Sequence, residues 1–181
     1  MDKLPGIRPR PSLWRRLDAM GRASFPASIT ALILVTESLP FGLPGQAQWQ
    51  PASALACVFF WSLYRPASMP PAVVFLLGLL ADLLGLSPVG ASVLVLLIAH
   101  GCAITWRRSL VRQGFLSVWL VFVGVSAVAA ALQWGLTCAL TLTLFSPAPA
   151  LFQWALGAGL YPLLATLFIR AHRGLADPSL A

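Results

Sequence analysis

The sequence predicts an all-α integral membrane protein, a bundle of six transmembrane helices with both termini in the cytoplasm. Fifty-nine per cent of the 181 residues are hydrophobic and 9% are charged, whereas a soluble domain carries about 25% charged residues. The mean hydropathy is +0.84. The hydrophobic residues form long runs, and basic residues stand at the ends of those runs. These observations exclude a soluble enzyme, a disordered chain and a disulfide-stapled secreted module.

The charge balance fits a membrane topology. Twelve Lys and Arg residues against five Asp and Glu residues give a net charge of +7. In a soluble protein this excess would favour nucleic-acid binding, but here the basic residues flank apolar spans, and we expect no nucleic-acid partner. Cys57, Cys102 and Cys138 are far apart in the sequence, so we expect them to be small buried hydrophobes.

Three regions follow from the distribution of polar residues. Residues 1–23 are the longest hydrophilic stretch and are predicted to form a basic cytoplasmic tail. Within it, apolar residues recur at helical spacing from Leu13 to Met20, which predicts either a short amphipathic segment on the anionic inner leaflet or a disordered tail. Residues 24–170 are predicted to form the transmembrane domain, and residues 171–181 a cytoplasmic C-terminal tail.

Proline and glycine clusters divide the transmembrane domain into six predicted spans: 25–43, 48–64, 71–86, 88–106, 115–142 and 151–169. Several lie near the limit of about 17–25 residues that a spanning helix needs, so length alone leaves their number open. With six spans, every Lys and Arg lies on the inner side, and the outer connections around 44–47, 87–88 and 146–149 contain none. The positive-inside rule therefore favours six spans.

Local signals refine two of the connections. Arg65-Pro66 and Met69-Pro70-Pro71 predict a tight turn between the second and third spans. Ser87-Pro88 predicts an N-cap followed by a proline at the first helical position of the fourth span.

Ionisable residues inside the spans are candidate functional residues, because their burial in a membrane is costly. Gly78, Asp82 and Gly85 are spaced i, i+4, i+7 and share one helix face, so Asp82 is expected to face another helix. All cations are predicted at the opposite membrane face. Three solutions remain open for Asp82: a protonated carboxyl, hydrogen bonds from backbone N–H groups near the start of the next span, or a donor from a partner.

The other polar residues support weaker expectations. Glu37 is expected at a disturbed helix end, in a structural or water-facing role, because a proline follows three residues later. His100 is expected to be a hydrogen-bonded core residue. Gln133 and Gln153 would complete a polar patch with Glu37 and Asp82. We expect this patch to be a hydrogen-bond network between helices, and a substrate pocket is the alternative.

The fifth span carries a stripe of small residues suited to close packing, either against another span or against another protein. These residues are Gly124, Ala127, Ala131, Gly135 and Cys138. The sequence contains no recognisable catalytic or metal-binding motif. We therefore expect a protein that is not an enzyme and that uses no metal or cofactor.

Residues 59–90 carry a recognisable pattern. An aromatic-rich run ends in Arg65-Pro66, the segment Phe75-Leu76-Leu77-Gly78-Leu79-Leu80-Ala81-Asp82 follows, and Pro88-Val89-Gly90 opens the next span. This pattern resembles the central signature of the rod shape-determining protein MreD family. The resemblance covers about a sixth of the chain, and the remainder is similar to the family in hydropathy only.

The resemblance implies a non-enzymatic, multi-pass scaffold in the bacterial inner membrane that serves the cell-elongation machinery of peptidoglycan synthesis. Its implied partners are MreC, MreB filaments, RodA and a penicillin-binding transpeptidase. The implied fold is similar to that of the substrate-binding subunits of energy-coupling-factor vitamin transporters. A runner-up function from a different class is a small-molecule uptake subunit with a pocket near Glu37, Asp82 and Gln133.

Carried onto this sequence, the family signature gives six positions of interest, to which Glu37 is added as a candidate. Arg65 and Pro66 would anchor and turn the chain at the cytoplasmic interface. Gly78 would permit close helix packing, and Asp82 would be a buried polar anchor. Pro88 and Gly90 would form a tight outer turn.

Overall fold

The computed structural model describes residues 13–40, 42, 45–85 and 88–176, which form six α-helices, one short 3-10 helix and no β-strand. The helices are α1 (Leu13–Glu37), α2 (Gln46–Tyr64), α3 (Pro71–Leu84), α4 (Ala91–Leu110), α5 (Phe115–Thr141) and α6 (Ala148–Ala176), and η1 (Pro66–Ser68) follows α2. The chain is therefore all-helical in its described part. Within that part of the chain, three helical segments are long and apolar enough to cross a membrane, which indicates a membrane protein: α4, α5 and the Ala148–Phe168 part of α6.

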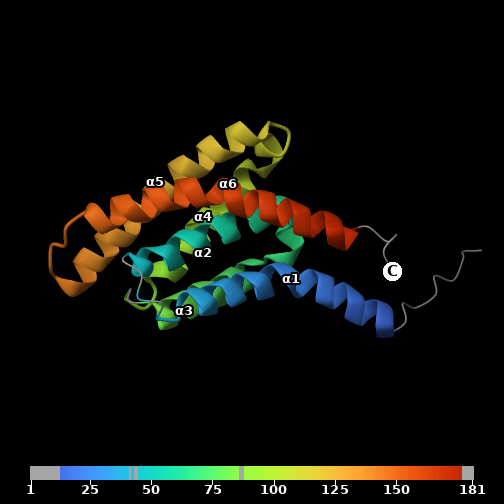
Figure 1. Cartoon of the computed structure of the whole chain (residues 1–181), viewed down its shortest axis with the longest axis horizontal. Coiled ribbons are helices and arrows are strands. Elements are labelled where there is room, and N and C mark those ends of the chain that lie inside the picture. The colour runs from blue at the N-terminus through green and yellow to red at the C-terminus, as the bar shows by residue number, and fades with distance from the viewer. Residues whose placement is uncertain (1–12, 41, 43–44, 86–87, 177–181) are drawn as a thin grey trace, which may run out of the picture.

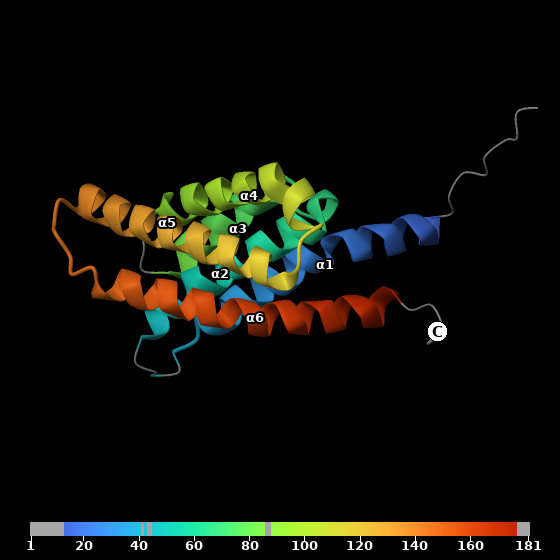
Figure 2. The ribbon, with the colours of Figure 1, turned by 90° about the horizontal axis from the view of Figure 1, so that it is seen from above.

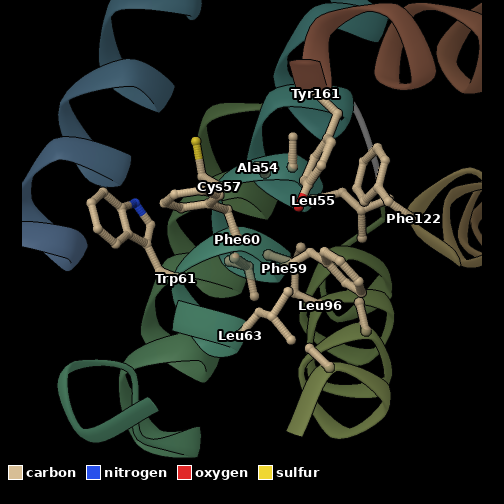
Figure 3. Close-up of a cluster of buried hydrophobic side chains, with 14 of the residues drawn as sticks. Ala54, Leu55, Cys57, Phe59, Phe60, Trp61, Leu63, Leu96, Phe122 and Tyr161 are labelled. Atoms are coloured by element: carbon tan, nitrogen blue, oxygen red, sulfur yellow. The ribbon is translucent and has the colours of Figure 1, made fainter. Parts of the chain in front are cut away.

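Helix α2 lies at the centre of the molecule and contacts all five other α-helices (Figure 1). Its residues from Ala52 to Leu63 are all buried, as expected for a helix that is apolar around its whole circumference. Aromatic rings fill the space around it (Figure 3). Phe59 packs edge-on against Phe122 of α5, which in turn stacks on Tyr161 of α6 with 4.2 Å between ring centroids. Such ring pairs add to the stabilisation from burial.

The terminal helices extend further than the sequence predicts. Helix α1 begins at Leu13 and continues through Pro26, so the predicted amphipathic segment is the first part of the same helix as the predicted first span. That helix ends at Glu37 and not at residue 43. Helix α6 continues to Ala176, so much of the predicted C-terminal tail is helical. Residues 1–12 and 177–181 of the two predicted tails lie outside the described residues.

The start of α4 also differs from the prediction. The helix begins at Ala91 and not at Pro88, so the placement of Pro88 at the first helical position is wrong. The Ala91 N–H donates to the Pro88 carbonyl at 3.1 Å, and Gly90 has a φ of +97°, a conformation that glycine adopts without strain. The predicted tight turn at Pro88–Gly90 is therefore confirmed. Ser87, the predicted N-cap, lies outside the described residues.

The connections lie at two opposite ends of the molecule (Figures 1 and 2). The 65–70 and 111–114 connections lie toward one end, which is also where α1 begins and α6 ends. The connection between α5 and α6 lies at the other end and projects beyond the ends of the remaining helices in both views. Three of its large apolar side chains are exposed: Leu142 and Leu144 are each 91% exposed and Phe145 is 50% exposed.

Tryptophan side chains tie α5 to α6. Trp119 of α5 donates its Nε1–H to the Ala158 carbonyl of α6 at 2.9 Å, and Trp154 of α6 donates to the Val123 carbonyl of α5 at 3.1 Å. Pro162 stands four residues after Ala158 and has no N–H, so the Ala158 carbonyl lacks its ordinary helical donor. The Trp119 indole supplies that donor from the neighbouring helix.

We expect this hydrogen bond to be detectable in a double-mutant cycle. W119F should lower the free energy of unfolding by about 1–3 kcal/mol, because the Ala158 carbonyl loses its donor. P162A restores a backbone N–H to that carbonyl, so W119F should cost clearly less in the P162A background; the packing change of Trp to Phe occurs in both backgrounds and cancels. Thermal unfolding of the four proteins in one detergent measures the coupling. Equal costs in the two backgrounds would contradict the interpretation.

Candidate functional site

The Asp82 carboxylate caps the start of α4 from a neighbouring helix. Asp82 lies on α3 and is 3% exposed. Its oxygens accept hydrogen bonds from the backbone N–H groups of Gly90 at 2.7 Å, Ser92 at 2.9 Å and Val93 at 3.4 Å. The first N–H groups of a helix have no partner within the helix, and Gly90 at the N-cap has no side chain to serve them. Of the three possibilities left open for Asp82, the structure therefore shows the second, hydrogen bonds from backbone N–H groups at the start of α4.

Gly78 brings α3 close enough to α4 for this capping. A Cβ atom at Gly78 would lie 2.6 Å from the Cα and 3.1 Å from the backbone nitrogen of Val93. The backbones of α3 and α4 are therefore in contact at Gly78, one helical turn before Asp82. Gly85 is also closely approached, because a Cβ there would lie 3.1 Å from the Gln50 Oε1 atom of α2. The predicted face of Gly78, Asp82 and Gly85 does face neighbouring helices.

Arg65 and Pro66 end α2 and turn the chain into α3. The Arg65 N–H donates to the Trp61 carbonyl at 2.7 Å, and Pro66 opens the η1 turn. Arg107 of α4 contributes a second donor, since its Nε–H bonds to the Leu63 carbonyl at 2.8 Å. A cation at a helix C-terminus is favourable. From the sequence, Arg107 was assigned to membrane topology alone; its place directly after the predicted span 88–106 was the available signal.

Glu37 connects the end of α1 to the start of α2. Its carboxylate accepts a hydrogen bond from the Ser53 hydroxyl of α2. The Gln46 amide donates to the Glu37 carbonyl at 3.0 Å and also to the Leu39 carbonyl. The expected structural role of Glu37 at a helix end therefore agrees with these contacts.

The remaining polar residues also join pairs of helices. His100 of α4 is 3% exposed, and its Nδ1 atom lies 2.7 Å from the Ser62 hydroxyl of α2, so it is the hydrogen-bonded core residue expected. Gln153 of α6 donates to Gln133 of α5 at 2.9 Å. These bonds, with those of Glu37 and Asp82, fit the expected role in contacts between helices. The hydrogen bonds join Glu37 to α2, Asp82 to α4 and Gln133 to Gln153 of α6.

The small residues of α5 line two surface grooves. Gly124 is exposed, with open space where a Cβ would stand. It lines a groove of about 320 Å³ between α4 and α5, hereafter the α4–α5 groove. Ala127 and Ala131 line a second groove of about 290 Å³ between α5 and α6, whose walls include Trp134 and Trp154. Three of the five residues of the predicted stripe thus line grooves, and they are divided between two of them.

No protein-family model, curated protein or solved structure matches this chain. Within the described ranges no group of three His, Cys, Asp or Glu side chains is placed to hold a metal ion. The strongest functional evidence in the molecule is therefore the Asp82 capping site together with the exposed apolar surface of α5 and its connection to α6.

Proposed function

We propose that this chain is a non-enzymatic scaffold of the bacterial inner membrane that serves the cell-elongation machinery, as the resemblance to the MreD family implies. The observation that carries the proposal is the apolar connection between α5 and α6, which projects from the bundle with Leu142 and Leu144 almost fully exposed. Exposed apolar surface marks a site of contact with another protein or with a membrane, and we assign the projecting connection to contact with a protein. The signature residues have internal tasks, since Asp82 caps α4 and Arg65 ends α2.

The proposed topology has six spans with both termini in the cytoplasm. It is supported by the position of Arg65, Arg107, Arg108 and Arg112 at or beside the two connections that lie toward one end of the molecule. The positive-inside rule places that end in the cytoplasm. Helix α2 fits a spanning role despite its polar residues, because neighbouring helices and not lipid surround it. The apolar connection of α5 and α6 would then face the periplasm.

The length of α5 supports a partner on the periplasmic side. Helix α5 has 27 residues and is about 40 Å long at 1.5 Å per residue, whereas the hydrocarbon core is about 30 Å thick. Its outer end would project toward the headgroups or beyond them. In the proposed function MreC, RodA and the transpeptidase meet the chain from this side, and MreB filaments approach the arginine-rich connections from the cytoplasm.

Depletion in the source bacterium separates the scaffold from the runner-up, a small-molecule uptake subunit. We expect rod-shaped cells to become round without acquiring a nutrient requirement. Uptake receives less support, because the Asp82 carboxylate already accepts three backbone N–H groups. Normal rods that need an added vitamin would overturn the scaffold proposal and favour uptake.

A second prediction tests the projecting connection directly. L144S should at least halve the recovery of membrane partners in a pull-down from mild detergent, because it removes apolar surface from the proposed contact. Leu144 is 91% exposed, so abundance and the thermal unfolding midpoint should not change. V89S is the matched control: Val89 is 69% exposed in the turn between α3 and α4, outside the projection. Equal recovery with L144S and wild type would contradict the assignment of this surface.

A further inference from the structure

The α4–α5 groove is an open apolar depression on the outer surface of the helix bundle. It has a volume of about 320 Å³ and runs from Val95 to Trp106 on α4 and from Val121 to Leu132 on α5. Ala99 and Ala129 are buried at its base, while Ile98 and Val128 are exposed along its rim. In a membrane this surface would face the hydrocarbon tails of lipids.

The length of the groove matches one leaflet of a bilayer. The two lining stretches are each about 17 Å long at 1.5 Å per residue, close to half of the roughly 30 Å hydrocarbon core. The connection 111–114 joins the two lining helices at one end of the groove, beyond Trp106. A spanning helix of another protein would need a groove about twice as long, whereas a lipid acyl chain extends over one leaflet.

Positive charge gathers at the same end of the groove. Arg112 lies in the 111–114 connection and Arg108 lies in the last turn of α4, and both are exposed. The sequence contains no Asp or Glu between residues 83 and 176, so α4, α5 and α6 offer these arginines no acidic partner. Trp106 is 48% exposed beside them, as is common at the level of lipid headgroups.

We infer that the α4–α5 groove binds an acyl chain of an anionic phospholipid whose phosphate headgroup lies at the end of the groove, where the positive charges of Arg108 and Arg112 attract it. The apolar walls fit the chain, the length fits one leaflet, and the arginines favour an anionic headgroup over a zwitterionic one. The inference requires that the protein lies in a membrane. It does not depend on the scaffold function, so either proposal can fail without the other.

The test compares two lipids on the full-length protein. The protein is reconstituted with equal amounts of dioleoyl phosphatidylglycerol and dioleoyl phosphatidylethanolamine and extracted in mild detergent, and native mass spectrometry counts the lipids that remain bound. We expect phosphatidylglycerol to be enriched, and R108Q/R112Q to reduce that enrichment by about fivefold for each arginine whose charge attracts the headgroup. R170Q is the matched control, because it removes an exposed arginine near the end of α6.

A second variant tests the groove itself. G124L should place a side chain in the groove without a clash, because nothing lies within 4 Å of a Cβ there. It should lower the retention of both lipids without lowering the thermal unfolding midpoint. G159L on α6, also in open space, is the control and should retain both lipids as wild type does.

Two results would overturn the inference. One is the wild-type lipid ratio in R108Q/R112Q, and the other is wild-type lipid retention in G124L. Loss of a co-purifying membrane protein from G124L with unchanged lipid retention would identify the groove as a site for a partner helix and would also overturn it.

Discussion

D82L should strongly destabilise the protein. The substitution removes the acceptor for the N–H groups of Gly90 and Ser92, which lie at 2.7 and 2.9 Å from the carboxylate oxygens. Ser92 is buried, and a buried N–H that loses its partner costs about 1–3 kcal/mol. The free energy of unfolding should therefore fall by about 1–3 kcal/mol from the Ser92 N–H, and further from the partly buried hydrogen bond of Gly90. Thermal unfolding in detergent and the amount of protein recovered from membranes both measure the loss.

Two further variants separate capping from other roles of Asp82. D82N keeps one carbonyl oxygen as an acceptor and should be affected less than D82L. S92A keeps the backbone N–H that donates to Asp82, so it should unfold close to the wild-type temperature. If D82L folds as well as wild type but loses a membrane partner, Asp82 acts at an interface with that partner and the capping interpretation is wrong.

The second large effect is expected at Gly78. G78A places a methyl group 2.6 Å from the Val93 Cα atom, where only movement of the α4 backbone can relieve the clash. Overpacking of this kind costs about 1–3 kcal/mol, and G78L should cost more and reduce protein abundance. The same movement would draw α4 away from Asp82, so the capping hydrogen bonds should weaken as well.

G101A is the matched control for G78A. Gly101 lies inside α4 with nothing within 4 Å of a Cβ. Alanine has the higher helix propensity by about 1 kcal/mol, so G101A should leave the unfolding midpoint unchanged or raise it. The two glycine-to-alanine changes should therefore have different effects. A G78A protein as stable as G101A would show that α3 and α4 do not approach as closely as described.

The sequence predicted the helices well where hydropathy and helix breakers agreed. The bounds of α2, α3 and α5 differ from the predicted spans by two residues or fewer. Prediction was poorer at Pro88, because the Ser-Pro pattern describes a cap supplied by adjacent residues, whereas α4 is capped by Asp82 from another helix. Spacing along one helix cannot distinguish backbone donors from a partner's side chain, so that question needed three-dimensional contacts.

Contacts between residues that are distant in the sequence could not be predicted for the same reason. The spacing of Gly78 and Asp82 predicted that one face of α3 packs against another helix, and the structure confirms this. The spacing could not identify that helix as α4. Trp119 and Pro162 were not singled out, because each is an ordinary residue of an apolar helix until the two helices are placed side by side. Because Pro162 has no N–H, the sequence did indicate that the carbonyl of Ala158, four residues earlier, lacks its helical hydrogen-bond donor.

The central position of α2 has a consequence for biosynthesis. Phe59, Phe60 and Trp61 of the second helix to be synthesised make ring contacts with Tyr161 and Phe168 of the last one. The aromatic core therefore cannot be completed until nearly the whole chain has left the ribosome. During that interval the apolar surface of α2 must be shielded by α1 or by other components of the cell, and a chain truncated before α6 would remain a substrate for proteases.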